Sequence, residues 1–282
     1  MKLKVEHITS FGYDEPISET ATEVRLQPRS DEGAPQKCLD FVLQLKPLAN
    51  IEYYSDFYGN NVHHFNILQS HKQIEIRAVS IVETSAGYVP ALPGEEIMRL
   101  DFLNPSRYVQ FDSLIREFSH QFTSLGLNNR QLAEEICRRI NEGFAYDKSV
   151  TDVHSTSIEV MALKRGVCQD FAHVMIAVCR CVGLPARYVS GYLYTGSASE
   201  GQAGASHAWC EVFCGPEVNG WVAFDPTHRQ LLTDERYIKI GIGRDYDDIP
   251  PVRGTFKGRT DEHMNVVVLV TEISQPNIAS EG

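Results

Sequence analysis

The segment RGVCQDFAHVM, residues 165–175, places a cysteine at the predicted start of a helix. The apolar residues that follow recur at helical spacing: Phe171, Val174, Met175, Val178 and Val182. Gly183 and Pro185 then end the run. Unpaired backbone N–H groups and the positive end of the helix dipole at such a position favour a thiolate over a thiol. Cys168 is therefore a candidate nucleophile, and the competing interpretation is a small, buried, inert cysteine.

A catalytic cysteine needs a base, usually a histidine, and a third group that orients the imidazole. His207 opens the alternating run HAWCEVF, and Asp225 lies near the end of the next run, WVAFDPT. The link GPEVNG is a turn signal, so the two runs are predicted to form a hairpin. If the turn is centred on Pro216, His207 lies directly opposite Asp225, with Cβ atoms about 4.5–5.5 Å apart. A turn at Asn219–Gly220 instead pairs Asp225 with Cys214.

Each of these residues also has a purely structural interpretation. Asp225, in Asp-Pro-Thr, is typical of a turn that ends a strand, and His207 fits an ordinary surface histidine. A cysteine at a helix start together with a histidine and an aspartate on one hairpin favours a Cys-His-Asp triad over three unrelated structural roles.

A metal centre is the chief chemical alternative, and the sequence argues against it. The chain has no C-x-x-C and no H-E-x-x-H motif. Cys179 and Cys181 are two apart on a helix and point in different directions, while His63 and His64 alternate faces on a strand. The segment GIGRDY lacks the lysine of a phosphate loop, and Asp247–Asp248 is typical of a solvated loop. We therefore expect neither a metal nor another cofactor.

Composition limits the partners and the compartment. The 282 residues carry a net charge of −11, which argues against a nucleic-acid or anionic-membrane partner. The N-terminus, MKLKVEHITSFGYDEP, lacks the continuous apolar run of a signal peptide, and VVVLV near the C-terminus is too short to span a bilayer. Seven cysteines at irregular spacing do not suggest a disulfide framework. A reducing cytoplasm is the expected location, and the oligomeric state is left open.

The order of predicted elements indicates an α+β protein. Residues 1–86 alternate as strands do, for example in CLDFVLQLKP and KQIEIRAVSIVET, and predict an antiparallel β region. Residues 87–109 hold three prolines and form a connecting segment. Residues 110–282 are assigned to a core with helical spacing over 110–125 and 128–143, then the Cys168 helix and further strands. This core includes the loop-like GRDYDDIPPVRGTFKG and the strand MNVVVLVTEI.

These residues resemble a known family. The stretch RGVCQDFAHVMIAVCRCVGLPARYVSGYL, with SHAWCEVF and GWVAFDPT, is similar to the core of bacterial transglutaminase-like proteins, which include proteins described as cysteine proteases. HITSFGYDEPI, VRLQPRS and YYSDFYGNNVHHF resemble the β-rich region that precedes that core. The resemblance implies a papain-like fold in which the nucleophile helix packs on an antiparallel sheet. It also implies Cys168 as nucleophile, His207 as base and Asp225 as orienting group.

One departure from the family concerns the oxyanion hole. In animal transglutaminases a tryptophan upstream of the cysteine helps to form it, whereas the only tryptophans here, Trp209 and Trp221, lie downstream. Tyr146 and Gln169 are the candidates for that place, and Trp209 is a further candidate contact. The backbone N–H of Cys168 is a donor under each scheme.

The expected activity is acyl transfer through an acyl-thioester. With water as acceptor the protein is a cysteine protease or amidase acting on a peptide or protein, and this is the preferred interpretation. With an amine as acceptor it is a transglutaminase. An arylamine acyltransferase has a similar triad but matches the flanking residues less well. A catalytically silent binding or scaffolding module is the alternative from another class.

Overall fold

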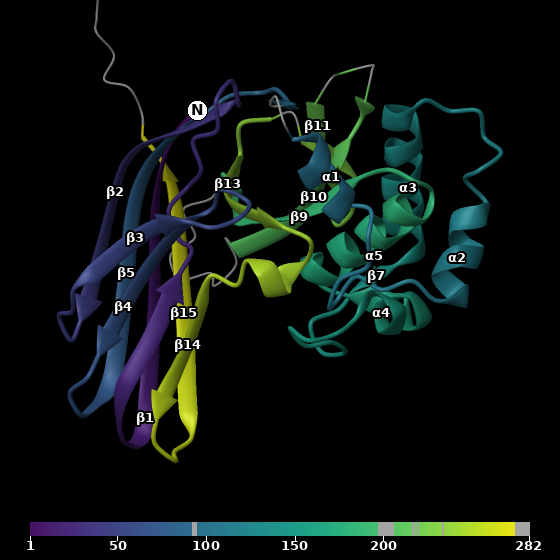
Figure 1. The fold of residues 1–282 in the computed structure, drawn as a ribbon. Helices are drawn as coiled ribbons and strands as arrows, with labels where there is room; N and C mark the ends of the chain where they lie inside the picture. The colour runs from purple at the N-terminus through teal and green to yellow at the C-terminus, as the bar shows by residue number, and fades with distance from the viewer. Residues whose placement is uncertain (92–94, 197–205, 216–217, 219, 233, 274–282) are drawn as a thin grey trace, which may run out of the picture.

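The computed structural model describes residues 1–91, 95–196, 206–215, 218, 220–232 and 234–273. It contains a body of long strands and, beside it, a core in which helices cover a second sheet (Figure 1). Among the described residues, no helix is both long and apolar enough to cross a membrane. The order of strands, then helices, then strands confirms the predicted α+β class.

The strand-rich body is an antiparallel sheet built around the 23-residue strand β1 (Lys2–Val24). The first half of β1 pairs with β5 (His71–Thr84) and β15 (Glu262–Glu272), and the second half with β4 (Asn61–Ile67) and β14 (Val252–Lys257). At the two ends of the sheet, β2 (Gln36–Lys46) pairs with β5 and β3 (Ile51–Ser55) with β4. The sheet encloses its own core, which includes Ile17, Phe65 and Ile76.

The C-terminal strands differ from the sequence prediction. The prediction assigns residues 110–282 to the core, but β14 and β15 add to β1 in the N-terminal sheet. The segment GRDYDDIPPVRGTFKG is also not a continuous loop, since it forms the 3-10 helix η2 (Tyr246–Asp248) and then β14. The glycines and prolines of this segment predict a loop. It forms a strand because β14 hydrogen-bonds to β1, which lies more than two hundred residues earlier in the chain.

The helices begin where the sequence offers capping side chains. Asp112 caps α2 (Ser113–His120), Asn128 caps α3 (Asn129–Gly143), and Thr156 caps α4 (Ser157–Leu163), each accepting a bond from a backbone N–H of the first turn. The two predicted helical stretches, 110–125 and 128–143, therefore correspond to α2 and α3. The connecting segment holds a short strand, β6 (Val89–Pro90), and a short helix, α1 (Glu96–Asp101).

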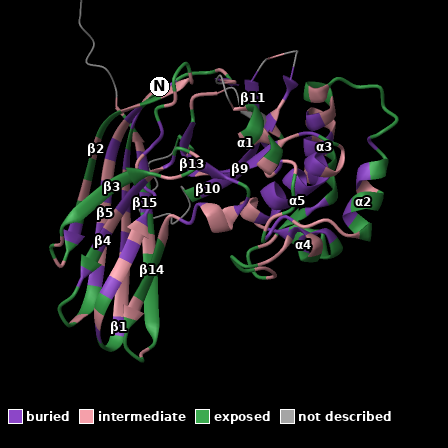
Figure 2. Ribbon diagram, in the orientation of Figure 1, coloured by how far each residue is buried: buried purple, intermediate pink, exposed green. Residues whose placement is uncertain are grey.

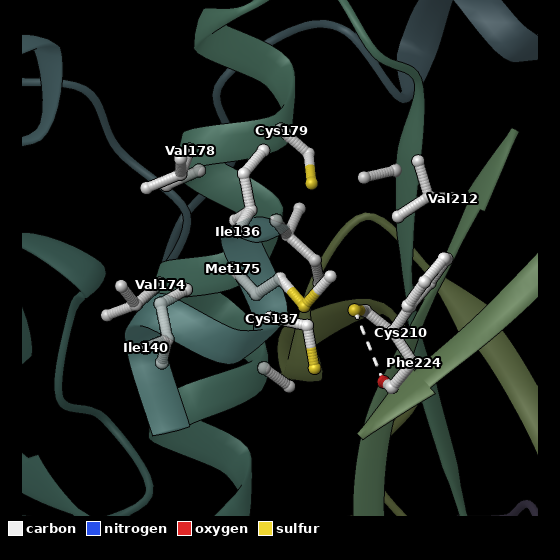
Figure 3. Close-up of a cluster of buried hydrophobic side chains, with 14 of the residues drawn as sticks. Ile136, Cys137, Ile140, Val174, Met175, Val178, Cys179, Cys210, Val212 and Phe224 are labelled. Atoms are coloured by element: carbon white, nitrogen blue, oxygen red, sulfur yellow. Dashed lines mark hydrogen bonds between the residues drawn. The ribbon is translucent and has the colours of Figure 1, made fainter. Parts of the chain in front are cut away.

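The core sheet is antiparallel, and its main path runs in the order β12-β11-β10-β9-β13. These strands are β12 (Gln230–Leu232), β11 (Gly220–Asp225), β10 (Ser206–Phe213), β9 (Ala186–Leu193) and β13 (Tyr237–Gly243). The central helix α5 (Cys168–Cys181) packs on β9 and β10 and is buried from Asp170 to Arg180 (Figure 2). Sulfur-bearing side chains, among them Cys137, Cys179 and Cys210, fill the layer between helices and sheet (Figure 3). Two short strands, β7 (Ala145–Tyr146) and β8 (Arg165–Gly166), pair in parallel before α5.

Both faces of β10 are buried. Cys210 faces the helices, and Glu211 on the other face is only 2% exposed. It is held by Arg187 Nε at 2.8 Å and by Lys239 Nζ at 2.5 Å. The N-terminal region covers this face, and Gln36 bonds both the N–H and the C=O of Lys239 in β13. The core and the N-terminal sheet thus share one buried boundary.

Candidate active site

Helix α5 begins at Cys168, which confirms the predicted position of the cysteine at a helix start. The turn before it is fixed by Asp170, whose Oδ2 accepts bonds from the Val167 N–H and the Thr151 hydroxyl, both at 2.7 Å. Gly166 permits this arrangement, because a Cβ there would lie 2.5 Å from the same carboxylate oxygen. The local fold therefore holds the Cys168 side chain at the positive end of a buried helix.

His207 lies on β10 opposite Gly191 of β9. Gly191 leaves room for the neighbouring side chains, because a Cβ there would lie 2.5 Å from Trp209 and 2.2 Å from the carbonyl oxygen of Ile238. The Trp209 ring packs against the His207 ring, with centroids 6.2 Å apart and planes inclined by 27°. Strand β10 thus presents a histidine that is 8% exposed and backed by an aromatic wall.

The hairpin of β10 and β11 has a different register from either one considered for the sequence. Cys210 lies opposite Phe224 and Phe213 opposite Trp221, so the register places Asp225 diagonal to His207 rather than directly opposite it. Pairing of Asp225 with Cys214 is also wrong. Part of the turn, including Pro216 and Asn219, lies outside the described residues. His207 and Asp225 still share a face, and the imidazole spans the diagonal.

Asp225 is fully buried and accepts bonds from five donors. Its Oδ2 accepts from His207 Nε2 at 2.7 Å, His228 Nδ1 at 2.7 Å and the Tyr237 hydroxyl at 2.9 Å. Its Oδ1 accepts from the backbone N–H groups of Thr227 at 2.9 Å and His228 at 3.4 Å. Burial raises the pKa of Asp225, but the bonds to the two histidines outweigh burial and lower it. The side chain is therefore a carboxylate at neutral pH.

His207 connects this carboxylate to the thiol. Because Nε2 faces Asp225, Nδ1 is the ring nitrogen left for Cys168, whose side chain also hydrogen-bonds His207. Burial lowers the pKa of His207, but the bonds to Asp225 and Cys168 and their charges raise it to about 10. At neutral pH a protonated imidazole therefore lies between the Cys168 sulfur and the Asp225 carboxylate.

Comparisons with known proteins bear on the same residues. Residues 116–226, which contain the cysteine, histidine and aspartate, match the model of the transglutaminase-like superfamily, and residues 3–83 match the bacterial transglutaminase-like N-terminal region. An uncharacterized protein of Mycobacterium leprae is 30% identical over 97% of this chain and 99% of its own length. The chain belongs to the transglutaminase-like superfamily.

Other similar proteins agree with this assignment. An uncharacterized protein of Mycobacterium tuberculosis is 32% identical, and the match covers 90% of this chain and 87% of that protein. A solved structure from Cytophaga hutchinsonii that carries the name "Putative Cysteine Protease" is 24% identical. It superposes with a TM-score of 0.76 and covers 98% of this chain and 92% of that one, so the two share their fold.

Two cavities meet at Cys168 of the transglutaminase-like core. The outer cavity, of about 650 Å³, is bordered by Tyr146, Lys148 and His228 together with Val266 and Val268 of β15. The inner cavity, of about 240 Å³, extends toward Tyr188, Ser190, Tyr246 and Pro251. His207 and Ser206 border both cavities. A molecule bound at Cys168 can therefore contact either cavity.

The three further candidates from the sequence occupy different places. Tyr146 borders the outer cavity, and burial together with the charges of Cys168 and Asp170 raises its pKa, so its hydroxyl stays a donor. Gln169 borders the inner cavity, but its amide already donates to the carbonyl of Val153 at 3.0 Å. Trp209 packs behind His207 and borders a separate small cavity under the N-terminal region. Tyr146 and Gln169 thus each border a cavity that Cys168 also borders, whereas Trp209 borders neither of these two cavities.

Tyr237 and His228 are partners of Asp225 that the sequence reasoning missed. His228 follows Asp225 by three residues, in DPTH, and its side chain is 49% exposed. Among the described residues, one group of side chains has the geometry to hold a metal ion. Its members are His207, Asp225 and His228, whose ligand atoms all lie within 4.8 Å of one another. Both histidines already bond Asp225 Oδ2, and Tyr237 supplies a third donor to the same oxygen. The donor set is therefore satisfied as a hydrogen-bond network without a cation.

Proposed function

We propose that this protein is a thiol-dependent enzyme that hydrolyses an amide or isopeptide bond of a peptide or protein. The observation that carries the proposal is the position of His207. It hydrogen-bonds the Cys168 side chain, and its Nε2 lies 2.7 Å from the buried Asp225 carboxylate. A thiol at a helix start, an imidazole and an orienting carboxylate are the parts that covalent acyl transfer requires.

The first step is attack by the Cys168 thiolate on the carbonyl carbon of the substrate. A C–S bond forms, and the π electrons of the carbonyl move to its oxygen. The Cys168 N–H at the start of α5 and the Tyr146 hydroxyl are the donors that we assign to this oxyanion. The raised pKa of His207 keeps the imidazole protonated, so a positive charge lies beside the attacking sulfur.

The second step breaks the C–N bond. His207 donates its Nδ1 proton to the departing amine, and a thioester with Cys168 remains. A water molecule then attacks the thioester and gives a proton back to His207, which releases the acid and restores the thiolate. Asp225 keeps the imidazole in one orientation throughout and balances its charge. We favour water as acceptor because hydrolysis needs no second site for an amine.

The test measures the rate of iodoacetamide alkylation at each of the seven cysteines against pH, in the wild type and in His207→Ala, by peptide mass spectrometry. We expect Cys168 to react fast well below pH 8.5, about the pKa of an ordinary thiol, and to lose that advantage in the variant. The other six cysteines are internal controls. If Cys168 reacts no faster than they do, the enzyme proposal fails and a binding module becomes the better explanation. Peptide substrates with and without an added amine then distinguish hydrolysis from transamidation.

A further inference from the structure

The N-terminal region contributes a charged side chain to the cavity beside the nucleophile. Arg25 follows directly after β1, is 8% exposed, and borders the inner cavity together with Cys168 and His207. Its backbone N–H donates to the carbonyl of Pro251 at 2.8 Å, and Pro251 borders the same cavity. Arg25 is thus anchored at the wall of the cavity, although it lies far from the core in sequence.

The Arg25 guanidinium is incompletely bonded. Its Nη2 lies 3.2 Å from Glu23 and its Nε 3.5 Å from Asp56. Charge-assisted bonds of this kind usually measure about 2.7–2.9 Å. Its Nη1 is buried and, within the described part of the chain, has no hydrogen-bond partner. A buried cation in this state gains from an anionic ligand that completes its bonds.

Other buried arginines of the protein show the contrast. Arg29 bonds Asp31 at 2.6 Å and Asn60 at 2.7 Å, and Arg187 bonds Glu211 at 2.7 Å. Arg180 donates to main-chain carbonyls from both of its terminal nitrogens at 2.7 Å. These guanidinium groups have structural partners at short distance. Arg25 is the one that combines longer contacts, an unpaired nitrogen and a position at the active-site cavity.

The walls of the inner cavity suit an anion. Among the described residues that border it, none is an aspartate or a glutamate, although the protein carries a net charge of −11. The polar groups beside Arg25 include the hydroxyl-bearing residues Ser190, Ser206 and Tyr246. A guanidinium and hydroxyl groups at a cavity wall whose described residues include no carboxylate offer hydrogen-bond donors to a carboxylate ligand.

We propose that Arg25 is a specificity-determining residue that binds a carboxylate of the substrate next to the scissile amide. This inference rests on the proposed function and narrows its substrates to peptides with a negative charge beside the cleaved bond. The carboxylate comes either from a free C-terminus or from an aspartate or glutamate side chain. The guanidinium binds either kind of carboxylate by exchanging its long contacts with Glu23 and Asp56 for shorter charge-assisted bonds.

The experiment uses alkylating reagents that differ only in charge. N-Iodoacetylglycine carries a carboxylate, and N-iodoacetylglycinamide is its neutral counterpart. The ratio of their rates at Cys168, read by peptide mass spectrometry, is expected to favour the carboxylate reagent by about tenfold, the value of one charge-assisted bond. Arg25→Gln is expected to abolish this preference. Arg77→Gln, an exposed arginine of β5 paired with Glu6, is the control that leaves the preference unchanged.

Glu23→Gln separates ligand binding from a structural role of Arg25. It removes the nearer acid and leaves the guanidinium in place, so the carboxylate preference is expected to persist or increase. Equal ratios in wild type and Arg25→Gln, or loss of the preference in Glu23→Gln, would overturn the proposal. The rate with the neutral reagent reports the thiolate alone, so failure of the proposed function is read separately.

A second pair of reagents identifies the source of the carboxylate. N-Iodoacetylglutamic acid α-amide has its charge on a side chain, and N-iodoacetylglutaminamide is its neutral counterpart. An Arg25-dependent preference for the glycine reagent alone assigns the cavity to a free C-terminus. An Arg25-dependent preference for the glutamate reagent assigns it to an acidic side chain. Absence of an Arg25-dependent preference in both pairs rejects the carboxylate site.

Discussion

The charge on the Asp225 carboxylate determines what His207 can do. Asp225 is fully buried, so its charge is tolerated only because five N–H and O–H groups donate to it. His228 and Tyr237 bond the same oxygen as His207. They keep the carboxylate ionised without displacing His207, and the ionised carboxylate in turn raises the pKa of the imidazole.

The raised pKa of His207 predicts a pH-dependent contribution to stability. The pKa is about 10 in the folded protein and 6.5 for an unperturbed histidine. A raised pKa means that the protonated form stabilises the fold; this contribution is complete below pH 6.5 and disappears as pH rises through about 10. The difference in Tm between wild type and His207→Gln should therefore be largest near pH 6 and shrink steadily toward pH 10. A difference that grows with pH would contradict the assigned state of His207.

At the residue scale, the sequence was informative where a residue type has a chemical requirement. A cysteine at a helix start and a histidine and an aspartate on one hairpin predicted three side chains that the structure brings together. Tyr237 and Arg25 could not be predicted, because each reaches the site from a segment whose local pattern carries no sign of it. His228 had a weak signal, three residues after Asp225, but ten histidines in the chain make such a spacing uninformative.

At the element scale, the hairpin shows which part of a register the sequence can predict. The predicted and observed registers of β10 and β11 differ by two residues along one strand. A shift of two preserves the face to which each side chain points, whereas a shift of one reverses it. The alternation of apolar and polar residues therefore placed His207 and Asp225 on a common face. The exact pairing depends on the conformation of the turn, where Gly215 has a φ of 63°.

Strand β9 predicts an effect on stability, because the packing around His207 needs a glycine there. In Gly191→Ala the new Cβ would lie 2.2 Å from the main-chain oxygen of Ile238, which cannot move without disturbing β13. We expect a loss of about 3 kcal/mol in the free energy of unfolding. Gly143→Ala is the matched control, because no atom lies within 4 Å of its added Cβ. Urea unfolding of both variants measures the difference, and equal midpoints would contradict the close packing.

In the molecule as a whole, the N-terminal sheet borders the cavity that contains Cys168. Leu3, Val5 and Val268 of the sheet pack with Tyr192 and Ile240 of the core. His7 of β1 bonds the Tyr192 hydroxyl at 2.8 Å. The last strand, β15, returns from the core to β1 and borders the outer cavity. The alternating pattern predicted β15 as a strand. It could not predict that β15 pairs with β1, because the two strands are far apart in the sequence.

This shared boundary predicts that the two parts unfold together. Val268, 6% exposed, faces the boundary, whereas its neighbour Leu269 is 41% exposed on the other face of β15. Val268→Asp buries an unpaired charge and should cost about 3 kcal/mol or more, while Leu269→Asp should stay within about 1 kcal/mol. Both tryptophans lie in the core sheet, so their fluorescence reports the core alone. If Val268→Asp lowers the fluorescence midpoint in urea together with the far-UV midpoint, a strand of the N-terminal sheet stabilises the transglutaminase-like core. A fluorescence midpoint equal to that of Leu269→Asp would mean that the two parts unfold independently.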